Sequence, residues 1–288
     1  MRPAHRFDPA WLLGPTLAFL ALFYFYPLLL AAYYSLLDWD LLTPARYVGF
    51  SNYRALLSSG SFATVLGTTL LISVLSVAGS MLAGLSLALA LNRPGKLVAF
   101  IRSSVFSAYV VSWVSVGLLW LWLLDADAGL VSALIQRLAP GSKGLLANVT
   151  TAPLALSAVL VWKTAGYAMV VFQSGLGSIP QSVLEAAELD GAGRVARLAH
   201  VVLPLLGPTT AFVAITSFIL SFQAFDVVRV MTQGGPVRST TVFVYSIYEQ
   251  MFMDLRVGRA SAEVMLFFVI LLVLTALQLR ISRRREAL

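Results

Sequence analysis

The 288-residue sequence contains no cysteine and few charged residues. Without cysteine the chain can form neither a disulfide bond nor a metal site built on thiolates. Charged residues make up 11% of the chain, whereas an ordinary soluble domain carries about 25%. This composition argues against a water-soluble enzyme and against a nucleic-acid-binding domain, although the formal net charge is +7.

Hydrophobic residues dominate the chain instead, at 59% of the composition and with a mean hydropathy of +0.86. One soluble core cannot hide this excess, so the bilayer is the expected surrounding. A membrane span needs roughly 20 apolar residues, and six runs pass this length test: residues 11–33, 63–91, 98–123, 153–176, 203–225 and 264–281. We therefore predict an all-α polytopic membrane protein with six transmembrane helices.

The basic residues predict the orientation of these spans, because loops rich in Lys and Arg stay in the cytoplasm. With the N-terminus inside, the cytoplasmic side collects Arg2, Arg6, Arg93, Lys96, Arg102, Arg194, Arg197, Arg280, Arg283, Arg284 and Arg285. Both termini are therefore expected in the cytoplasm. The long segment 226–263 is then expected on the outer side.

The cytoplasmic segment 178–202 is the most informative part of the sequence. Ser178 and Gln181 have the spacing of a capping box, which predicts a helix that starts there. Gly191 predicts the end of this helix, because glycine accepts the left-handed conformation found there. With a second helix over 192–202, the segment is expected to form a helix-turn-helix elbow.

The chemistry of this elbow favours protein docking over catalysis. Ala186 and Ala187 remove side-chain bulk, so that a partner can approach the backbone closely. Glu185 and Glu188 are three residues apart and share one helical face. Asp190 lies at the turn, where it could cap the second helix.

These residues resemble the coupling loop of binding-protein-dependent ABC importer permeases, in which a pair of helices seats in a cleft of the cytoplasmic ATPase. The resemblance rests on Glu185-Ala186-Ala187, Asp190-Gly191-Ala192 and Leu203-Pro204. It extends along nearly the whole chain and is similar to the carbohydrate branch, through Tyr26-Pro27, Val48-Gly49-Phe50-Ser51-Asn52-Tyr53, Thr232-Gln233-Gly234-Gly235-Pro236 and Gly258-Arg259-Ala260-Ser261-Ala262. The sequence departs from the family at Leu198, where Phe is usual, and at Phe106-Ser107, where Leu-Pro is usual.

The resemblance implies a type I ABC importer permease fold, a location in the cytoplasmic (inner) membrane of a bacterium or archaeon, and a set of partners. Expected partners are a homologous second permease, two copies of an ABC ATPase, an extracytoplasmic substrate-binding protein and the lipid bilayer. Within the chain, the resemblance implies an N-terminal part (1–62), a permease domain (63–281) and a basic tail (282–288).

ATP is expected to bind a separate chain, because this sequence lacks a phosphate-binding loop of the G-x-x-x-x-G-K-[ST] type. Gly95-Lys96 comes nearest, but Leu97 follows it and Ala90 stands at the first glycine position. ATP and Mg²⁺ would then belong to the partner ATPase, and neither a cofactor nor a metal is expected in this chain.

Polar residues inside the spans are candidate substrate contacts, because they are costly in a bilayer unless paired or wetted. Lys163 lies about 15 Å into the fourth span at about 1.5 Å per residue. It could contact a substrate hydroxyl or phosphate, or instead form a structural bond to a helix carbonyl. The same two interpretations, substrate contact or helix packing, remain open for Tyr167, Gln173, Ser217, Ser221 and Gln223.

The outer segment Thr232, Gly234, Gly235 and Pro236 is expected to act as a gate or as a docking surface for the binding protein, with a simple turn as the alternative. A secondary transporter and a membrane-embedded enzyme are the rival interpretations of the chain. The first fits poorly because spans one to five contain no acidic residue apart from Asp226 at an edge. The second fits poorly because two histidines, His5 and His200, supply no acid–base pair. We predict an importer of a sugar, with glycerol-3-phosphate or a glycerophosphodiester as the alternative substrate.

Overall fold

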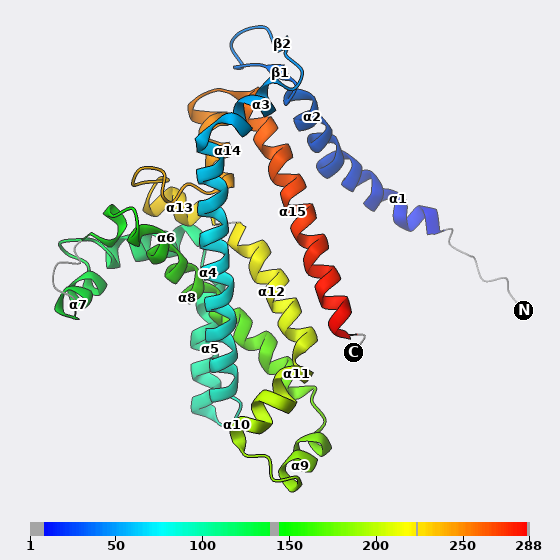
Figure 1. Ribbon diagram of the computed structural model, residues 1–288, viewed down its shortest axis with the longest axis vertical. Coiled ribbons are helices and arrows are strands. Elements are labelled where there is room, and N and C mark those ends of the chain that lie inside the picture. The colour runs from blue at the N-terminus through cyan, green and yellow to red at the C-terminus, as the bar shows by residue number, and fades with distance from the viewer. Residues whose placement is uncertain (1–8, 139–143, 223, 287–288) are drawn as a thin grey trace, which may run out of the picture. The chain divides into compact units, whose positions relative to one another are not determined.

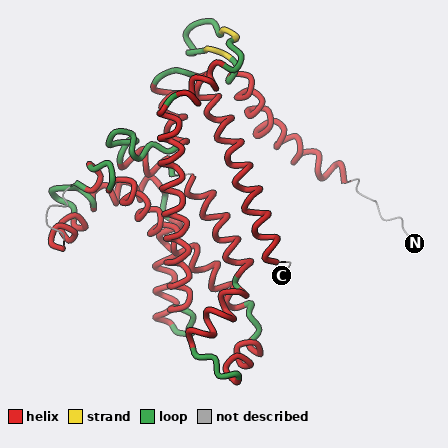
Figure 2. Tube along the Cα trace, in the orientation of Figure 1, coloured by secondary structure: helices red, strands yellow, loops and turns green. Residues whose placement is uncertain are grey.

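The computed structural model describes residues 9–138, 144–222 and 224–286, which are helical almost throughout (Figures 1 and 2). In this part of the chain the strands are β1 (Leu37–Asp38) and β2 (Arg46–Tyr47), which pair antiparallel. The predicted all-α class is therefore confirmed. The chain divides into two compact units, residues 1–62 with 246–270 and residues 63–245 with 271–288.

The first unit contains the first and last predicted spans. Its elements are α1 (Pro9–Leu20), η1 (Ala21–Phe25), α2 (Tyr26–Tyr34), β1, β2, α3 (Ser51–Ser58), the end of α14 (Phe243–Tyr248), η4 (Glu249–Met253) and the first part of α15 (Val257–Glu286). The stretch Leu13–Tyr34 passes the test for a membrane span, and so does Val257–Leu277.

The last span starts earlier than hydropathy predicts, at Val257 rather than at residue 264. Glu263 therefore lies inside α15 rather than at the end of an outer loop, and it is 1% exposed. It accepts hydrogen bonds from the hydroxyl of Ser246 at 3.1 Å and from the side-chain amide of Gln250. A carboxylate that receives such bonds can be buried, and a hydropathy window does not register this compensation.

The second unit holds the remaining spans and the elbow. Its elements are α4 (Gly60–Ala90), α5 (Lys96–Val110), α6 (Trp113–Leu123), α7 (Leu130–Leu138), η2 (Leu145–Ala147), α8 (Thr151–Gly177), α9 (Gln181–Leu189), α10 (Arg194–Arg197), η3 (Leu198–Val202), α11 (Leu203–Leu205), α12 (Gly207–Phe222) and α13 (Phe225–Met231), followed by the start of α14 and the end of α15. Figure 1 shows α9 and α10 beyond the ends of α5 and α8.

Two of the predicted spans are broken rather than continuous. The 98–123 run consists of α5 and α6, which meet at an angle of 103°. In the fifth span, Arg194–Leu205 and Gly207–Phe222 meet at 67°. Four single helices thus qualify as membrane spans, and the number of spans rises to six if each bent pair counts as one. Hydropathy misses the first break because the run stays apolar while the backbone becomes extended at Val111 and Ser112.

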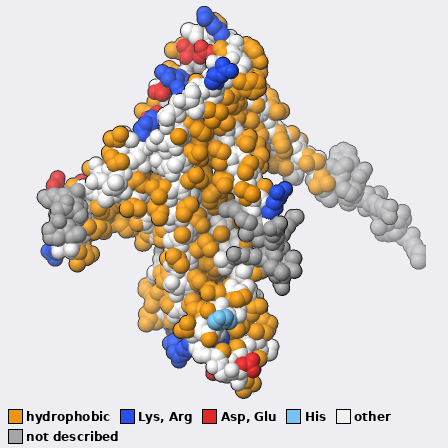
Figure 3. All heavy atoms as spheres, in the orientation of Figure 1, with side chains coloured by type: hydrophobic (Ala, Val, Ile, Leu, Met, Phe, Trp, Pro, Cys, Tyr) orange, Lys and Arg blue, Asp and Glu red, His pale blue; other side chains and the backbone are white. Residues whose placement is uncertain are grey.

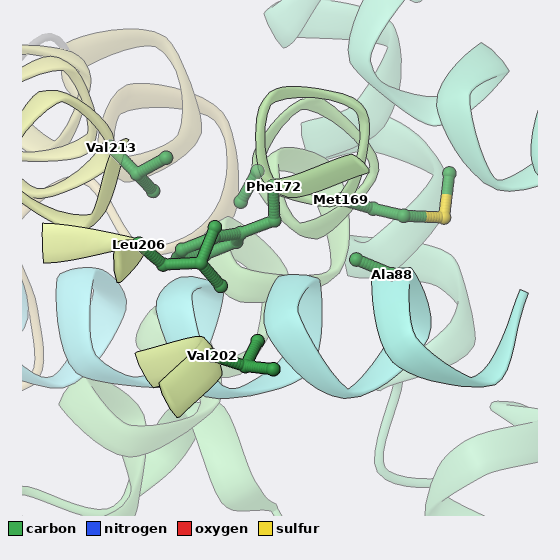
Figure 4. Close-up of a cluster of buried hydrophobic side chains, with 7 residues drawn as sticks. Ala88, Met169, Phe172, Val202, Leu206 and Val213 are labelled. Atoms are coloured by element: carbon green, nitrogen blue, oxygen red, sulfur yellow. The ribbon is translucent and has the colours of Figure 1, made fainter. Parts of the chain in front are cut away.

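The core of the second unit forms around α8, 14 of whose residues are buried. Figure 4 shows Met169 and Phe172 of α8 with residues of neighbouring segments, namely Ala88 of α4, Val202 of η3, Leu206 before α12 and Val213 of α12. Because this cluster includes Val202 of η3 and Leu206 at the break before α12, it joins the elbow to the spans.

Close helix packing in this unit depends on Gly166 of α8. A Cβ atom at this position would lie 2.5 Å from the carbonyl oxygen of Val105 in α5. Small residues allow such approach between membrane helices, where van der Waals contact stabilises the pair. Polar pairing adds to it, because the hydroxyls of Ser80 and Thr164 lie 2.6 Å apart between α4 and α8.

Gly166→Ala is therefore expected to destabilise the protein by about 1–3 kcal/mol, because α5 must move away to accept the methyl group. Gly67→Ala is the matched control, since nothing lies within 4 Å of its added Cβ, and it should be neutral or slightly stabilising. Thermal unfolding of the purified protein in detergent measures both. Equal melting temperatures for the two variants would contradict the packing described here.

Candidate functional site

The turn of the elbow is a complete helix-terminating motif. The N–H of Gly191 donates to the carbonyl of Glu188 at 3.1 Å, and the N–H of Ala192 donates to the carbonyl of Ala187 at 3.0 Å. These two bonds define a Schellman motif. Gly191 has a φ of +79°, which a residue with a Cβ adopts only at a cost. The predicted end of α9 is thus confirmed.

The start of α9 differs from the prediction. Pro180 occupies the N-cap position, and no side chain caps the helix there. The hydroxyl of Ser178 instead donates to the carbonyl of Gly175 at 2.7 Å, because Ser178 still belongs to the last turn of α8. The predicted capping box is therefore wrong. Asp190 does not cap the second helix either, because Gly193 is the N-cap of α10 and no side-chain cap bond forms there.

The two arms of the elbow are fastened to each other and to the core. Glu188 of α9 accepts a hydrogen bond from Arg197 of α10 in an ion pair of 3.1 Å. Ile179, Leu184 and Leu198 pack against the cluster around α8. The elbow is therefore placed by apolar packing, because an exposed ion pair contributes about 1 kcal/mol at most.

The surface of the elbow that faces away from the spans carries exposed apolar and acidic side chains together. Leu189 is 89% exposed and Val195 is 81% exposed, and Glu185 and Asp190 are exposed beside them. In Figure 3 this end of the unit shows acidic, basic and apolar atoms on one surface. Exposed aliphatic groups next to charges are typical of a protein-docking surface.

The remaining predicted elbow residues lie on α9 and at the start of the fifth span. Ala186 is exposed and Ala187 is half-buried, so both leave the backbone of α9 accessible. Leu203 and Pro204 begin α11, where Leu203 is 39% exposed. The structure thus brings the predicted elbow residues together in one connected segment.

Lys163 of α8 reaches the break between α5 and α6. Its ammonium group donates to the carbonyl oxygens of Ala108, Tyr109 and Val111, at 3.3, 3.1 and 2.5 Å. It also lies 4.4 Å from the centre of the Trp113 ring. The three bonds use the three N–H groups of the ammonium and favour the structural interpretation of this residue.

The other polar residues of α8 face different neighbours. The ring of Tyr167 stacks on Tyr109 of α5 with centroids 5.0 Å apart, next to Lys163. The amide of Gln173 instead donates to the carbonyl of Leu91, after the end of α4, at 3.4 Å. The structure therefore separates Gln173 from the other two.

The polar residues of the fifth span are buried in α12. Ser221 donates to the carbonyl of Phe218 at 2.7 Å. The hydroxyl of Ser217 is buried without a hydrogen-bond partner among the described residues. Gln223 lies outside the described part of the chain.

Sequence inspection missed a polar row on α4, formed by Thr69, Ser73, Ser76 and Ser80. All four are buried, and the hydroxyls of Ser73 and Ser76 have no partner within the described residues. The spacing i, i+4, i+7 and i+11 places the row on one helical face, which was the available signal. Membrane helices commonly bury serine for packing, and the surrounding apolar run concealed the pattern.

The outer segment forms a compact loop closed by threonines. The hydroxyls of Thr232 and Thr240 lie 2.8 Å apart, and Thr240 also donates to the carbonyl of Gly235 at 2.7 Å. Gly234 is buried with a φ of +79°, and the peptide bond before Pro236 is cis. The threonine hydrogen bonds therefore close the loop.

Comparison with known proteins adds the family. The family described as "Binding-protein-dependent transport system inner membrane component" matches residues 79–287, which is more than half of the chain. The sn-glycerol-3-phosphate transport system permease protein UgpA of Agrobacterium fabrum is 33% identical over 96% of this chain and 95% of its own. The multiple sugar-binding transport system permease protein MsmF of Streptococcus mutans is 32% identical over 92% and 91%.

Solved structures agree on the fold. A chain of a bacterial ABC transporter involved in the import of the acidic polysaccharide alginate matches with a TM-score of 0.80 at 22% identity, covering 96% of both chains. A second alginate transporter structure, in complex with an alginate pentasaccharide-bound periplasmic protein, matches with a TM-score of 0.82 at 22% identity. The match covers 96% of this chain and 95% of that chain. At this identity the likeness establishes the type I permease fold.

Lys163→Met is expected to destabilise the protein in the absence of any substrate, by about 1–3 kcal/mol for each buried carbonyl left unpaired. Arg137→Met, at an exposed position of α7, is the control and should leave the melting temperature unchanged. Thermal unfolding measures both. A Lys163→Met protein with unchanged stability but weakened substrate-dependent transport would instead assign Lys163 to the substrate.

Proposed function

This chain belongs to the family of binding-protein-dependent transport system inner membrane components, and from that premise we propose that it forms half of the membrane pathway for a sugar. It is a multi-pass permease subunit of an ABC importer, and a partner chain hydrolyses the ATP. The observation that carries the proposal is the elbow, whose exposed outer face is joined by packing to the central helix of the second unit.

The elbow can transmit a movement of the ATPase to the helices of the pathway. An ATPase seated on Leu189, Glu185 and Asp190 would move α9 and α10 together, because Glu188 and Arg197 pair the two arms. The movement reaches α8 through the packing of Leu184 and Leu198. Packed interfaces with two discrete arrangements convert such local contacts into opening and closing of a pathway.

From α8 the movement reaches the broken span. Lys163 holds the end of α5, so a shift of α8 shifts the α5–α6 break as well. In this proposal ATP-driven closure of the partner therefore acts on the α5–α6 break through one helix.

Hydroxyl-bearing residues support a sugar as the substrate. Ser217 on α12 and Ser73 and Ser76 on α4 have buried hydroxyls available for hydrogen bonds. Lys163 lends no support to a phosphate substrate, because its three N–H groups already bind carbonyls. Glycerol-3-phosphate or a glycerophosphodiester stays the second candidate, because one relative at 33% identity is named for sn-glycerol-3-phosphate transport.

The proposed assembly contains a homologous second permease, two ATPase copies with ATP and Mg²⁺, and an extracytoplasmic binding protein. Both termini and the elbow lie in the cytoplasm in this arrangement, because their arginines belong inside. The loop of Thr232, Gly234, Gly235 and Pro236 then faces outward, where a loop closed by hydrogen bonds suits a gate or the docking of the binding protein. Residues 1–62, 63–281 and 282–288 remain the proposed division of the chain.

Glu185→Arg and Asp190→Arg are each expected to reduce ATP-driven uptake about tenfold or more, because a reversed charge faces the partner at a docked surface. Membrane insertion and the melting temperature should stay unchanged, since both side chains are exposed. Asp127→Arg, which reverses an exposed charge at a distance from the elbow, is the control. Uptake by vesicles with normal amounts of inserted protein measures the effect, and wild-type uptake in both elbow variants would refute the coupling role.

The associated binding protein is expected to bind a sugar with micromolar affinity in calorimetric titration and to leave glycerol-3-phosphate and glycerophosphodiesters unbound. Titration with both ligand classes under the same conditions decides between the two substrates. Binding of a phosphodiester alone would overturn the sugar assignment while leaving the elbow role intact.

A further inference from the structure

A groove of about 520 Å³ lies among α4, α5 and α8 and has apolar walls. Its lining includes Leu87 of α4, Ile101 and Ala108 of α5, and Trp162 of α8. The hydroxyl in the lining, that of Ser104, donates to the carbonyl of Phe100 at 3.0 Å, and the indole of Trp162 adds one N–H donor. A sugar needs more hydrogen-bond partners than these walls offer, so the groove suits an apolar occupant.

Basic residues stand at one end of this groove. Arg93 and Lys96 lie in and next to the turn between α4 and α5, and both are exposed. Arg102 follows on α5, next to the lining residue Ile101. None of the three forms an ion pair within the described part of the chain. The sequence contains no acidic residue between Asp40 and Asp125 that could neutralise the turn.

The distances along α5 match the layers of one bilayer leaflet. The lining residue Phe100 comes four residues after Lys96, and Ala108 comes twelve residues after it. At about 1.5 Å per residue the groove therefore extends from roughly 6 to 18 Å beyond Lys96. Positive charge at the headgroup level and apolar walls at the acyl-chain level are the arrangement that an anionic phospholipid fits.

We propose that this groove binds an acyl chain of an anionic phospholipid of the bilayer, whose phosphate lies against Arg93 and Lys96. A helix of a partner protein would fill the apolar walls but would leave the positive charge at the mouth without a counterpart. Lys and Arg side chains can extend along apolar surface and place their charge at the headgroup, which suits Arg102 as a further contact. The site goes beyond the transport role and depends only on the location of the chain in a membrane.

A photocrosslinker in the groove tests the proposal. Ile101 is replaced by p-benzoylphenylalanine in the full-length chain, which is purified with its partner subunits and placed in nanodiscs of phosphatidylcholine with a minor fraction of phosphatidylglycerol. Leu82, which is 69% exposed on α4 and does not line the groove, receives the same crosslinker as the control. Mass spectrometry of the adducts gives the lipid composition at each position.

At position 101 we expect phosphatidylglycerol to be enriched over its bilayer fraction by at least about fivefold, the ratio that about 1 kcal/mol of attraction per basic residue gives. At position 82 the adducts should follow the bilayer composition. Arg93→Gln with Lys96→Gln should abolish the enrichment, whereas Arg137→Gln on α7 should preserve it. Bilayer composition at position 101, or an adduct with a partner polypeptide there, would overturn the proposal.

Discussion

The structure depends on the hydrogen-bond partners of backbone carbonyls inside the bilayer. A helix that ends inside the hydrocarbon layer leaves carbonyls without partners, and no water is present there to replace them. In this chain α5 ends at Val110, and the ammonium of Lys163 donates hydrogen bonds to three carbonyls around the break in place of water. A cation at a helix C-terminus is also favoured by the helix dipole. One buried charge thus makes a 103° bend compatible with the membrane.

This constraint links the broken span to the elbow. Lys163 belongs to α8, and α8 also carries Met169 and Phe172, against which the residues of the elbow pack. A force on the elbow and a change at the α5–α6 break are therefore connected through a single helix. Gly166, between these two parts of α8, lets α5 approach closely enough for the Lys163 bonds to form. Chains of packed side chains of this kind can carry coupling between two sites.

Much of the fold follows from the sequence, because the length of the hydrophobic runs predicts the spans and the basic residues beside them predict their orientation. The end of α9 was predictable at Gly191, since glycine adopts a positive φ at little cost. The break after Val110 was not, because it depends on a lysine that comes 53 residues later and meets it only in the fold. The start of α9 failed for a similar reason, because Ser178 bonds to the preceding helix rather than to the following one.

The candidate site also contains residues that local sequence spacing could predict and residues that only the tertiary fold brings together. Docking residues are local, so Glu185, Ala186, Ala187 and Asp190 could be placed on one elbow from their spacing alone. Pathway residues depend on which helices face each other, and spacing could not reveal that Gln173 reaches the end of α4 while Tyr167 stacks on α5. The buried serines of α4 stayed hidden inside an apolar run. Glu263 was assigned to the outer loop, because its hydrogen-bond partners Ser246 and Gln250 lie on other segments.

The docking of the elbow on a cytoplasmic ATPase is the central claim, and the absence of cysteine allows a direct measurement. A single Leu189→Cys residue is labelled with a membrane-impermeant maleimide in inside-out vesicles, before and after the ATPase is stripped, with Leu138→Cys on α7 as the control. The account predicts that Cys at 189 is protected by the bound ATPase and becomes reactive when the ATPase is removed, while the control is labelled only from the outer side. Equal labelling of position 189 with and without the ATPase, or labelling from the outside of intact cells, would contradict it.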